Sequence, residues 1–143
     1  MSEVEKAVEI YGQGFACSQA VLGAFCEQFG LDVETAYKIS SGFGGGMHLN
    51  KTCGVITGAF MVIGLKHGRT KADDTEAKVK TYKLMAEFTG KFKAKHKYIG
   101  CTALLGCNIA TEDGLREAKE KDLFKQLCPD FVKTSAQILK EIL

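Results

Sequence analysis

Hydrophobic side chains recur along this chain mainly at intervals of three and four residues, the spacing that places them on one face of an α-helix. Residues that favour helix ends flank several of these stretches: Asp32 is placed to cap one helix, and Gly30 and Gly68 to end two others. The spacing predicts helices over residues 2–11, 17–30, 32–39, 53–67, 73–98 and 129–143. Because the alternation typical of β-strands is scarce, we expect an all-α fold.

The segment 53–67 differs from the others because it is hydrophobic on nearly every side. A helix without a polar face is buried in the middle of a bundle. Its most apolar stretch, residues 53–65, is shorter than the roughly 18 residues that suggest a membrane-spanning helix. We therefore expect a compact multi-helix bundle around this central helix, a single domain over residues 1–143 and no membrane span.

The segment 73–98 is a long amphipathic stretch with lysines on its polar side. Its apolar face is predicted to carry Val79, Tyr82, Met85, Phe88 and Phe92. Residues 91–98 also alternate lysine with less polar residues at a period of two, as a half-exposed strand would. A lone strand would have no partner, so a helix or an extended loop is the preferred interpretation.

Composition and charge narrow the class of protein without naming a partner. The 143 residues are 45% hydrophobic and 25% charged, as in ordinary globular domains, and the formal net charge is only +2. A near-neutral chain has no strong field toward nucleic acid, so the lysines of residues 91–97 are interpreted as a solvated helix face. The first residues include acids where a secretory signal needs a basic end, and we expect a cytoplasmic protein.

Residues 41–53 form a glycine-rich loop that leads into the central helix. The dinucleotide fingerprint fails there because Met47 occupies its last glycine position, and the P-loop pattern fails because Asn50 stands where its second glycine belongs. Both motifs also need a preceding strand, whereas the segment before this loop has a helical pattern. We therefore interpret the loop as a sharp turn that delivers Cys53 to the start of the central helix.

The same loop supplies the candidate cofactor contacts, Gly44, Gly45, Gly46 and His48, although no particular cofactor is indicated. Glycines allow the backbone to approach a bound group closely. His48 lies near Cys53 in the sequence, where an imidazole can polarise a thiolate, accept a proton or ligate a metal. A solvent-exposed histidine without a role is the alternative interpretation.

The chain contains six cysteines, which is many for a reducing compartment, where stable disulfides are rare. Four of them stand at predicted helix starts: Cys17, Cys53, Cys101 and Cys128. Unpaired N–H groups and the helix dipole place partial positive charge at such a position, which lowers the pKa of a thiol and favours the thiolate. Because thiolates attack disulfides and bind soft metals, these four are the candidate catalytic or metal-ligating residues.

The other two cysteines, Cys26 and Cys107, are interpreted as small buried hydrophobic residues. Cys26 is about half a turn out of phase with Cys17 on the same predicted helix, so the two face opposite sides. No Cys-x-x-Cys pair, zinc-finger spacing or haem-attachment motif is present. A site built from the four helix-start cysteines would therefore have to form through tertiary packing.

These four cysteines, together with the segment Cys53–Gly58, resemble the pattern of the C_GCAxxG_C_C family, to which a redox role is attributed. The resemblance extends from residue 17 to residue 128 and implies a helical protein whose four matched cysteines carry its activity. One position departs from the pattern, because the family has alanine where this chain has Val55. The family name specifies neither a reaction nor a substrate.

The cysteine pattern supports three functional hypotheses. In the first, the protein is a thiol-dependent oxidoreductase: Cys53 attacks, one of the other three cysteines resolves the mixed disulfide, and the redox partner is unidentified. In the second, the same four thiolates bind an iron–sulfur cluster or another soft metal in an electron-transfer protein. In the third, the cysteines are buried packing residues of a structural or assembly module.

Overall fold

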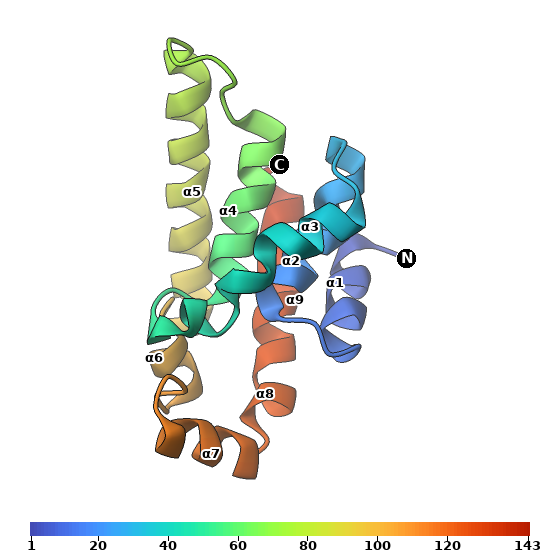
Figure 1. Cartoon of the computed structure of the whole chain (residues 1–143). Coiled ribbons are helices and arrows are strands. Elements are labelled where there is room, and N and C mark those ends of the chain that lie inside the picture. Colours follow the sequence, from blue (N-terminus) through green and yellow to red (C-terminus); the bar gives the residue numbers. More distant parts are fainter.

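The computed structural model describes residues 1–143 and consists of α-helices joined by turns (Figure 1). The helices are α1 (Glu3–Gly12), α2 (Cys17–Phe25), α3 (Val33–Ser40), α4 (Gly54–His67), α5 (Thr75–His96), α6 (Cys101–Leu105), α7 (Glu112–Glu120), α8 (Leu123–Gln126) and α9 (Cys128–Ile142). Short 3₁₀ turns follow α2 and α3, and a wider π-type turn precedes α4. No β-strand is present, so the predicted all-α fold class is confirmed.

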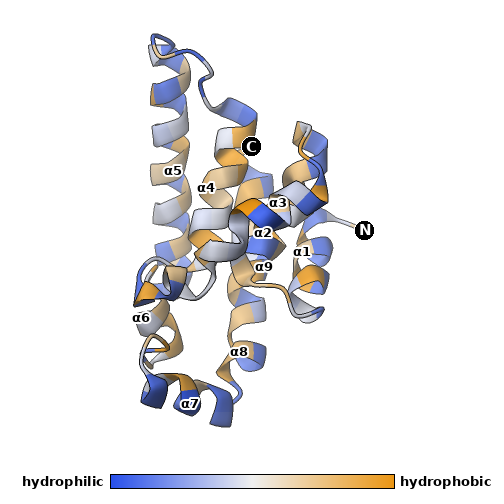
Figure 2. Ribbon diagram, in the orientation of Figure 1, coloured by the Kyte–Doolittle hydropathy of each residue, from blue (hydrophilic) through white to orange (hydrophobic).

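The central position of α4 is visible in Figure 1, where this helix runs between α5 on one side and α2 and α9 on the other. Its side chains Val55, Ile56, Ala59, Val62 and Ile63 are fully buried. Figure 2 shows that the most hydrophilic colours lie on outer helices such as α7. The prediction that this segment forms the buried middle of the bundle is confirmed. None of the helices combines the length and the apolar composition needed to cross a bilayer.

Close packing fixes the start of α2 against the start of α4. A Cβ at Gly58 would lie only 2.9 Å from the Ser18 carbonyl oxygen, so the contact requires glycine there. The buried Ser18 hydroxyl donates a hydrogen bond to the Ser40 carbonyl oxygen at 2.8 Å, which joins α2 to α3. The Ser135 hydroxyl donates to the Val55 carbonyl oxygen at 2.8 Å and joins α9 to the same end of α4. Four helices therefore meet where α4 begins.

The predicted helix ends around residue 30 agree with the structure. The second predicted helix is α helical to Phe25 and continues as a 3₁₀ turn to Phe29, and Gly30 ends it with a left-handed φ of 84°. The Asp32 carboxylate accepts a hydrogen bond from the Thr35 N–H at 3.0 Å and caps α3. Local side-chain chemistry is therefore enough to place these boundaries.

The helix α5 continues through residues 91–96, which confirms a helix in the segment where period-two alternation also allowed a strand. Its buried residues are Leu84, Phe88 and Phe92, one turn apart. The prediction that Val79 and Tyr82 lie on the inner face is wrong, since these side chains are 59% and 57% exposed. Figure 1 shows the reason: the N-terminal end of α5 extends past the end of α4 and has little to pack against.

The segment 99–127 contains three helices, α6 to α8, of which the sequence indicates only the start of α6, at Cys101. Each is short, with nine residues in α7 and fewer in the other two. A helix of one or two turns shows too few repeats of the hydrophobic spacing to be recognised. Together these helices form the lower end of the molecule in Figure 1 and connect α5 to α9.

Candidate functional site

The four cysteines singled out by the sequence all lie at helix starts, as predicted. Cys17, Cys101 and Cys128 are the first residues of α2, α6 and α9, and Cys53 directly precedes α4. These helices come from widely separated parts of the chain. Only tertiary packing can bring their first turns together.

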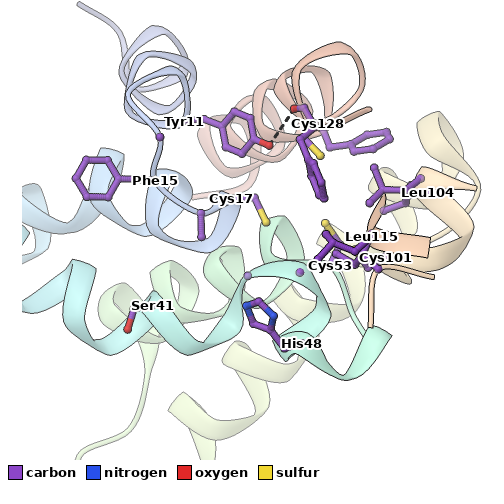
Figure 3. A pocket seen from close by; sticks show the side chains of 18 residues that line it. Tyr11, Phe15, Cys17, Ser41, His48, Cys53, Cys101, Leu104, Leu115 and Cys128 are labelled. Carbon is purple, nitrogen blue, oxygen red and sulfur yellow. Dashed lines mark hydrogen bonds between the residues drawn. The ribbon is translucent and has the colours of Figure 1, made fainter. Parts of the chain in front are cut away.

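The four cysteines line one cavity of about 310 Å³ (Figure 3). Thirteen of the eighteen lining residues are hydrophobic, so the cavity is largely apolar. Three of the four loop residues expected to contact a cofactor, Gly44, Gly45 and His48, also line it. The fourth, Gly46, is not part of the lining and lies behind Cys101, whose Cβ would be 3.2 Å from a Cβ at that glycine.

Backbone pairing brings Cys53 and Cys101 to the same wall of the cavity. The segments that precede them form an isolated antiparallel bridge. The Cys53 N–H donates to the Ile99 carbonyl oxygen at 2.8 Å, and the Cys101 N–H donates to the Lys51 carbonyl oxygen at 2.9 Å. Figure 3 shows these two cysteines next to each other, with Cys17 approaching from the neighbouring α2.

Cys17 is the cysteine whose surroundings favour its thiolate. Its sulfur lies against the start of α4, where a Cβ at Gly54 would be 2.5 Å away, and its charge is stabilised by the neighbouring Cys53 thiol and by the backbone N–H groups of Gly45, Ser18 and Gly54. These donors lower the pKa of Cys17, although burial of the side chain acts in the opposite direction. They come from the glycine-rich loop and from the starts of α2 and α4. Of the four cysteines, Cys17 is therefore the one whose thiolate is stabilised by its surroundings.

The other three cysteines are held as thiols. The neighbouring Cys17, together with burial, raises the pKa of Cys53 well above its ordinary value. Burial raises the pKa of Cys101 to about 12 and that of Cys128 to about 11, and the charge of Cys17 adds to both effects. The prediction that helix starts favour all four thiolates is therefore wrong for three of them, because desolvation outweighs the effect of the helix start. Cys53, the cysteine expected to attack, is therefore not the one whose surroundings favour the thiolate.

The glycine-rich loop is a sharp turn, as predicted, and its backbone is left-handed. Gly45, Gly46, Met47 and His48 all have φ between 54° and 63°. A Cβ at Gly46 would lie 2.6 Å from the Lys51 nitrogen, so a side chain is excluded there. Left-handed backbone costs roughly 1–2 kcal/mol for each residue with a side chain, so Met47 and His48 are held in it by the surrounding structure. His48 is exposed at the rim of the cavity.

Sequence reasoning missed the aromatic wall of the cavity. Tyr11, Phe15, Phe124 and Phe131 line it, and the Tyr11 hydroxyl donates a hydrogen bond to the Phe124 carbonyl oxygen at 2.9 Å (Figure 3). The same hydroxyl interacts with the Cys128 thiol and partly offsets the rise in its pKa. These aromatic residues have the spacing of ordinary core positions, so no local signal distinguishes them as site residues.

Cys26 and Cys107 lie outside the cavity lining. Both are buried, as predicted, and the Cys26 thiol donates to the Gly23 carbonyl oxygen at 3.5 Å within its own helix. All six cysteines are unpaired in this structure. The six thiols therefore divide into four around the cavity and two that pack in the core.

The donor geometry does not fit a metal centre built from the four cysteines. No three histidine, cysteine, aspartate or glutamate side chains are grouped closely enough to hold a metal ion. An iron–sulfur cluster of the common types is held by four cysteine thiolates at once. The hypothesis of a bound cluster therefore gains no support from the arrangement of these side chains.

The fold and the cavity define a class: an all-α protein in which four helix-start cysteines surround an apolar pocket. The family model described as "Putative redox-active protein (C_GCAxxG_C_C)" matches residues 15–142, and the chain belongs to this family. The match includes all four cysteines of the pocket. No curated protein and no solved structure matches the chain.

The different environments of the cysteines give a measurable pH dependence. Alkylation requires the thiolate, whose fraction rises with pH through the pKa of the thiol. Because the pKa of Cys17 is lowered, its labelling by iodoacetamide should reach a plateau at lower pH than the value of about 8.5 for a free cysteine would give. The pKa of Cys128 is raised to about 11, so its labelling should still be increasing when that of Cys17 is constant. Peptide mapping by mass spectrometry over a pH series measures both, and the reverse order would contradict the assignment.

Proposed function

We propose that the protein is a thiol–disulfide redox protein in which Cys17 and Cys53 form the exchanging pair. The observation that carries the proposal is the position of the Cys17 sulfur beside Gly54, the residue that follows Cys53: a Cβ at Gly54 would lie 2.5 Å from this sulfur. Such a pair provides one cysteine that is ready to attack and a second that is held as a thiol beside it. The family description, redox-active protein, agrees with this chemistry at the level of class.

The reaction begins when the Cys17 thiolate attacks one sulfur of a disulfide substrate. The S–S bond of the substrate breaks, Cys17 forms a mixed disulfide, and the first half of the substrate leaves as a thiolate. Cys53 then loses its proton and attacks the Cys17 sulfur, which releases the second half. The substrate gains two electrons and becomes two thiols, and the protein retains a Cys17–Cys53 disulfide. An external dithiol returns this disulfide to the reduced pair.

The backbone donors around Cys17 support both steps. The N–H groups of Gly45, Ser18 and Gly54 stabilise negative charge on the Cys17 sulfur. In the reverse, reducing step, the same groups make Cys17 the better leaving group, because a sulfur with a lower pKa leaves faster. In a reducing compartment such as the cytoplasm, which the sequence predicts, thiol pools keep such a pair in the dithiol state.

Cys101 and Cys128 complete the proposed site as thiols that border the exchanging pair. Both line the same cavity as Cys17, and the charge of Cys17 raises the pKa of both. When oxidant is in excess, Cys101 and Cys128 exchange with the Cys17–Cys53 disulfide in this proposal. A Cys101–Cys128 bond forms, the Cys17–Cys53 bond breaks, and that pair returns to two thiols for another round of oxidation. A Cys101–Cys128 link that appears only after the Cys17–Cys53 link would report this transfer.

The test is to treat the reduced protein with a limiting amount of a small disulfide, quench it with acid and map the peptides by mass spectrometry. The expected product is a Cys17–Cys53 disulfide. Six free thiols, or links that involve only Cys26 and Cys107, would overturn the proposal. Anaerobic purification with iron analysis and a visible spectrum is the matching control. Stoichiometric iron with visible absorbance would replace the proposal with the electron-transfer hypothesis.

A further inference from the structure

Apart from the Cys17 thiolate of the proposed pair, the walls of the cavity around the four cysteines carry no formal charge. No Asp, Glu, Lys or Arg is among its lining residues, and His48 at the rim is the only basic side chain. Phe15, Leu104 and Leu115 are among its apolar lining residues (Figure 3). A negatively charged ligand would lose its hydration there without meeting a Lys or Arg side chain of opposite charge in the wall, which is strongly unfavourable.

The exchanging pair lies below the surface of the protein. Cys17 is only 8% exposed and Cys53 only 5%. Exchange requires a substrate sulfur in contact with the Cys17 sulfur, so the substrate has to enter the cavity. The cavity volume of about 310 Å³ is near the lower end of the roughly 300–1,000 Å³ typical of small-ligand pockets. A disulfide that carries folded polypeptide on both sides is too bulky for this space.

An approach route leads to the cavity between the end of α1 and the α8–α9 junction. A surface hollow there is lined by Lys125 and Pro129, and it shares Tyr11, Phe15 and Phe124 with the cavity. Apart from Gly14, the residues common to both spaces are aromatic, so an apolar molecule would remain in contact with apolar surface as it enters.

We infer that the substrate of the Cys17–Cys53 pair is a small, mainly apolar disulfide that carries no negative charge. This inference rests on the proposed function and specifies its substrate class. A thiolate at Cys17 disfavours an anionic substrate further, because like charges repel. In the exchange, the S–S bond of the small molecule breaks and its two halves leave as thiols. The two electrons come from the cysteine pair, which closes the Cys17–Cys53 bond.

Two disulfides with the same ring scaffold test the role of charge. One is 2,2′-dipyridyl disulfide, which is neutral, and the other is 6,6′-dithiodinicotinate, which adds a carboxylate to each ring. The rate of thione release with the folded protein is divided, for each reagent, by its rate with a small free thiol. The neutral reagent should then be favoured by about tenfold or more, because a buried carboxylate without a partner costs well above the 1.4 kcal/mol that corresponds to a factor of ten.

A charge placed in the wall provides the matched variant. Leu115→Lys puts a positive charge on a residue that lines the cavity from α7, and it should reduce the preference for the neutral reagent by about fivefold or more. Glu120→Gln changes the net charge by the same amount on the exposed surface of the same helix, and the preference should be unchanged. Circular dichroism shows whether both variants fold.

The outcomes separate this inference from the proposed function. Equal normalised rates for the two reagents, with the Cys17–Cys53 link formed by both, would overturn the substrate class and leave the redox pair in place. No Cys17–Cys53 link with either reagent would remove the proposed function itself. If Leu115→Lys does not fold, the wild-type rate ratio alone decides, because it needs no substitution.

Discussion

Cys17→Ser is expected to lower the rate of disulfide exchange by about a thousandfold or more, the largest effect of any single substitution in the protein. The serine hydroxyl has nearly the same size as the thiol but does not attack disulfides. The backbone N–H groups that interact with the Cys17 sulfur would then have no thiolate to stabilise. Stopped-flow measurement of thione release from 2,2′-dipyridyl disulfide gives the rate.

Replacement of Cys53 should separate the two steps of the reaction. Cys53→Ser is expected to retain the first step and to accumulate the mixed disulfide at Cys17, which intact-protein mass spectrometry detects. A serine hydroxyl can still donate a hydrogen bond to the Cys17 sulfur, whereas alanine cannot, so Cys53→Ala should raise the pKa of Cys17 relative to Cys53→Ser. Cys26→Ala is the control, since Cys26 is buried away from the cavity. A similar loss of activity in Cys26→Ala and Cys17→Ser would contradict the assignment.

Gly54→Ala is expected to damage stability and reactivity together. A Cβ at this position would lie 2.5 Å from the Cys17 sulfur and 2.9 Å from the Ser18 nitrogen, and the second contact is with backbone that cannot move aside. We expect a loss of about 1–3 kcal/mol in the free energy of unfolding, as for other overpacked core sites. Urea denaturation measures the loss. The pH at which labelling of Cys17 is half-maximal should rise toward that of a free cysteine, because the Cys17 sulfur is displaced from the N–H donors.

The matched control for this prediction is Gly64→Ala in the same helix. A Cβ at Gly64 would have no atom within 4 Å, and alanine favours a helix over glycine by about 1 kcal/mol. This variant should be as stable as the wild type or more so. Equal destabilisation by Gly54→Ala and Gly64→Ala would show that the close contact with Cys17 does not set the requirement for glycine.

Much of the fold could be predicted because its main elements carry local signals. The apolar character of residues 53–67 on nearly every side predicts a buried central helix, and Asp32 and Gly30 mark helix ends by their own side-chain and backbone chemistry. The inner face of α5 could not be predicted correctly. Val79 and Tyr82 have suitable spacing but lie where α5 extends past its neighbours, and only the assembled bundle determines that.

The candidate site was predictable in its residues but not in its electrostatics. The position of the four cysteines at helix starts follows from sequence, and three of the four predicted loop contacts line the cavity with them. The distinction between Cys17 and the others depends on burial and on N–H groups from three separate segments. Sequence spacing contains no information about desolvation, so it could not show that Cys53, Cys101 and Cys128 stay protonated.

The left-handed turn of residues 45–48 determines how the reactivity of Cys17 can vary. The backbone conformations between left-handed and right-handed turns are sterically forbidden, so such a turn does not convert by small adjustments. The Gly45 N–H therefore either interacts with the Cys17 sulfur or makes no interaction with it at all. Differences in the acidity of this thiol between conditions should then reflect the relative populations of two discrete loop states rather than a continuous adjustment of one.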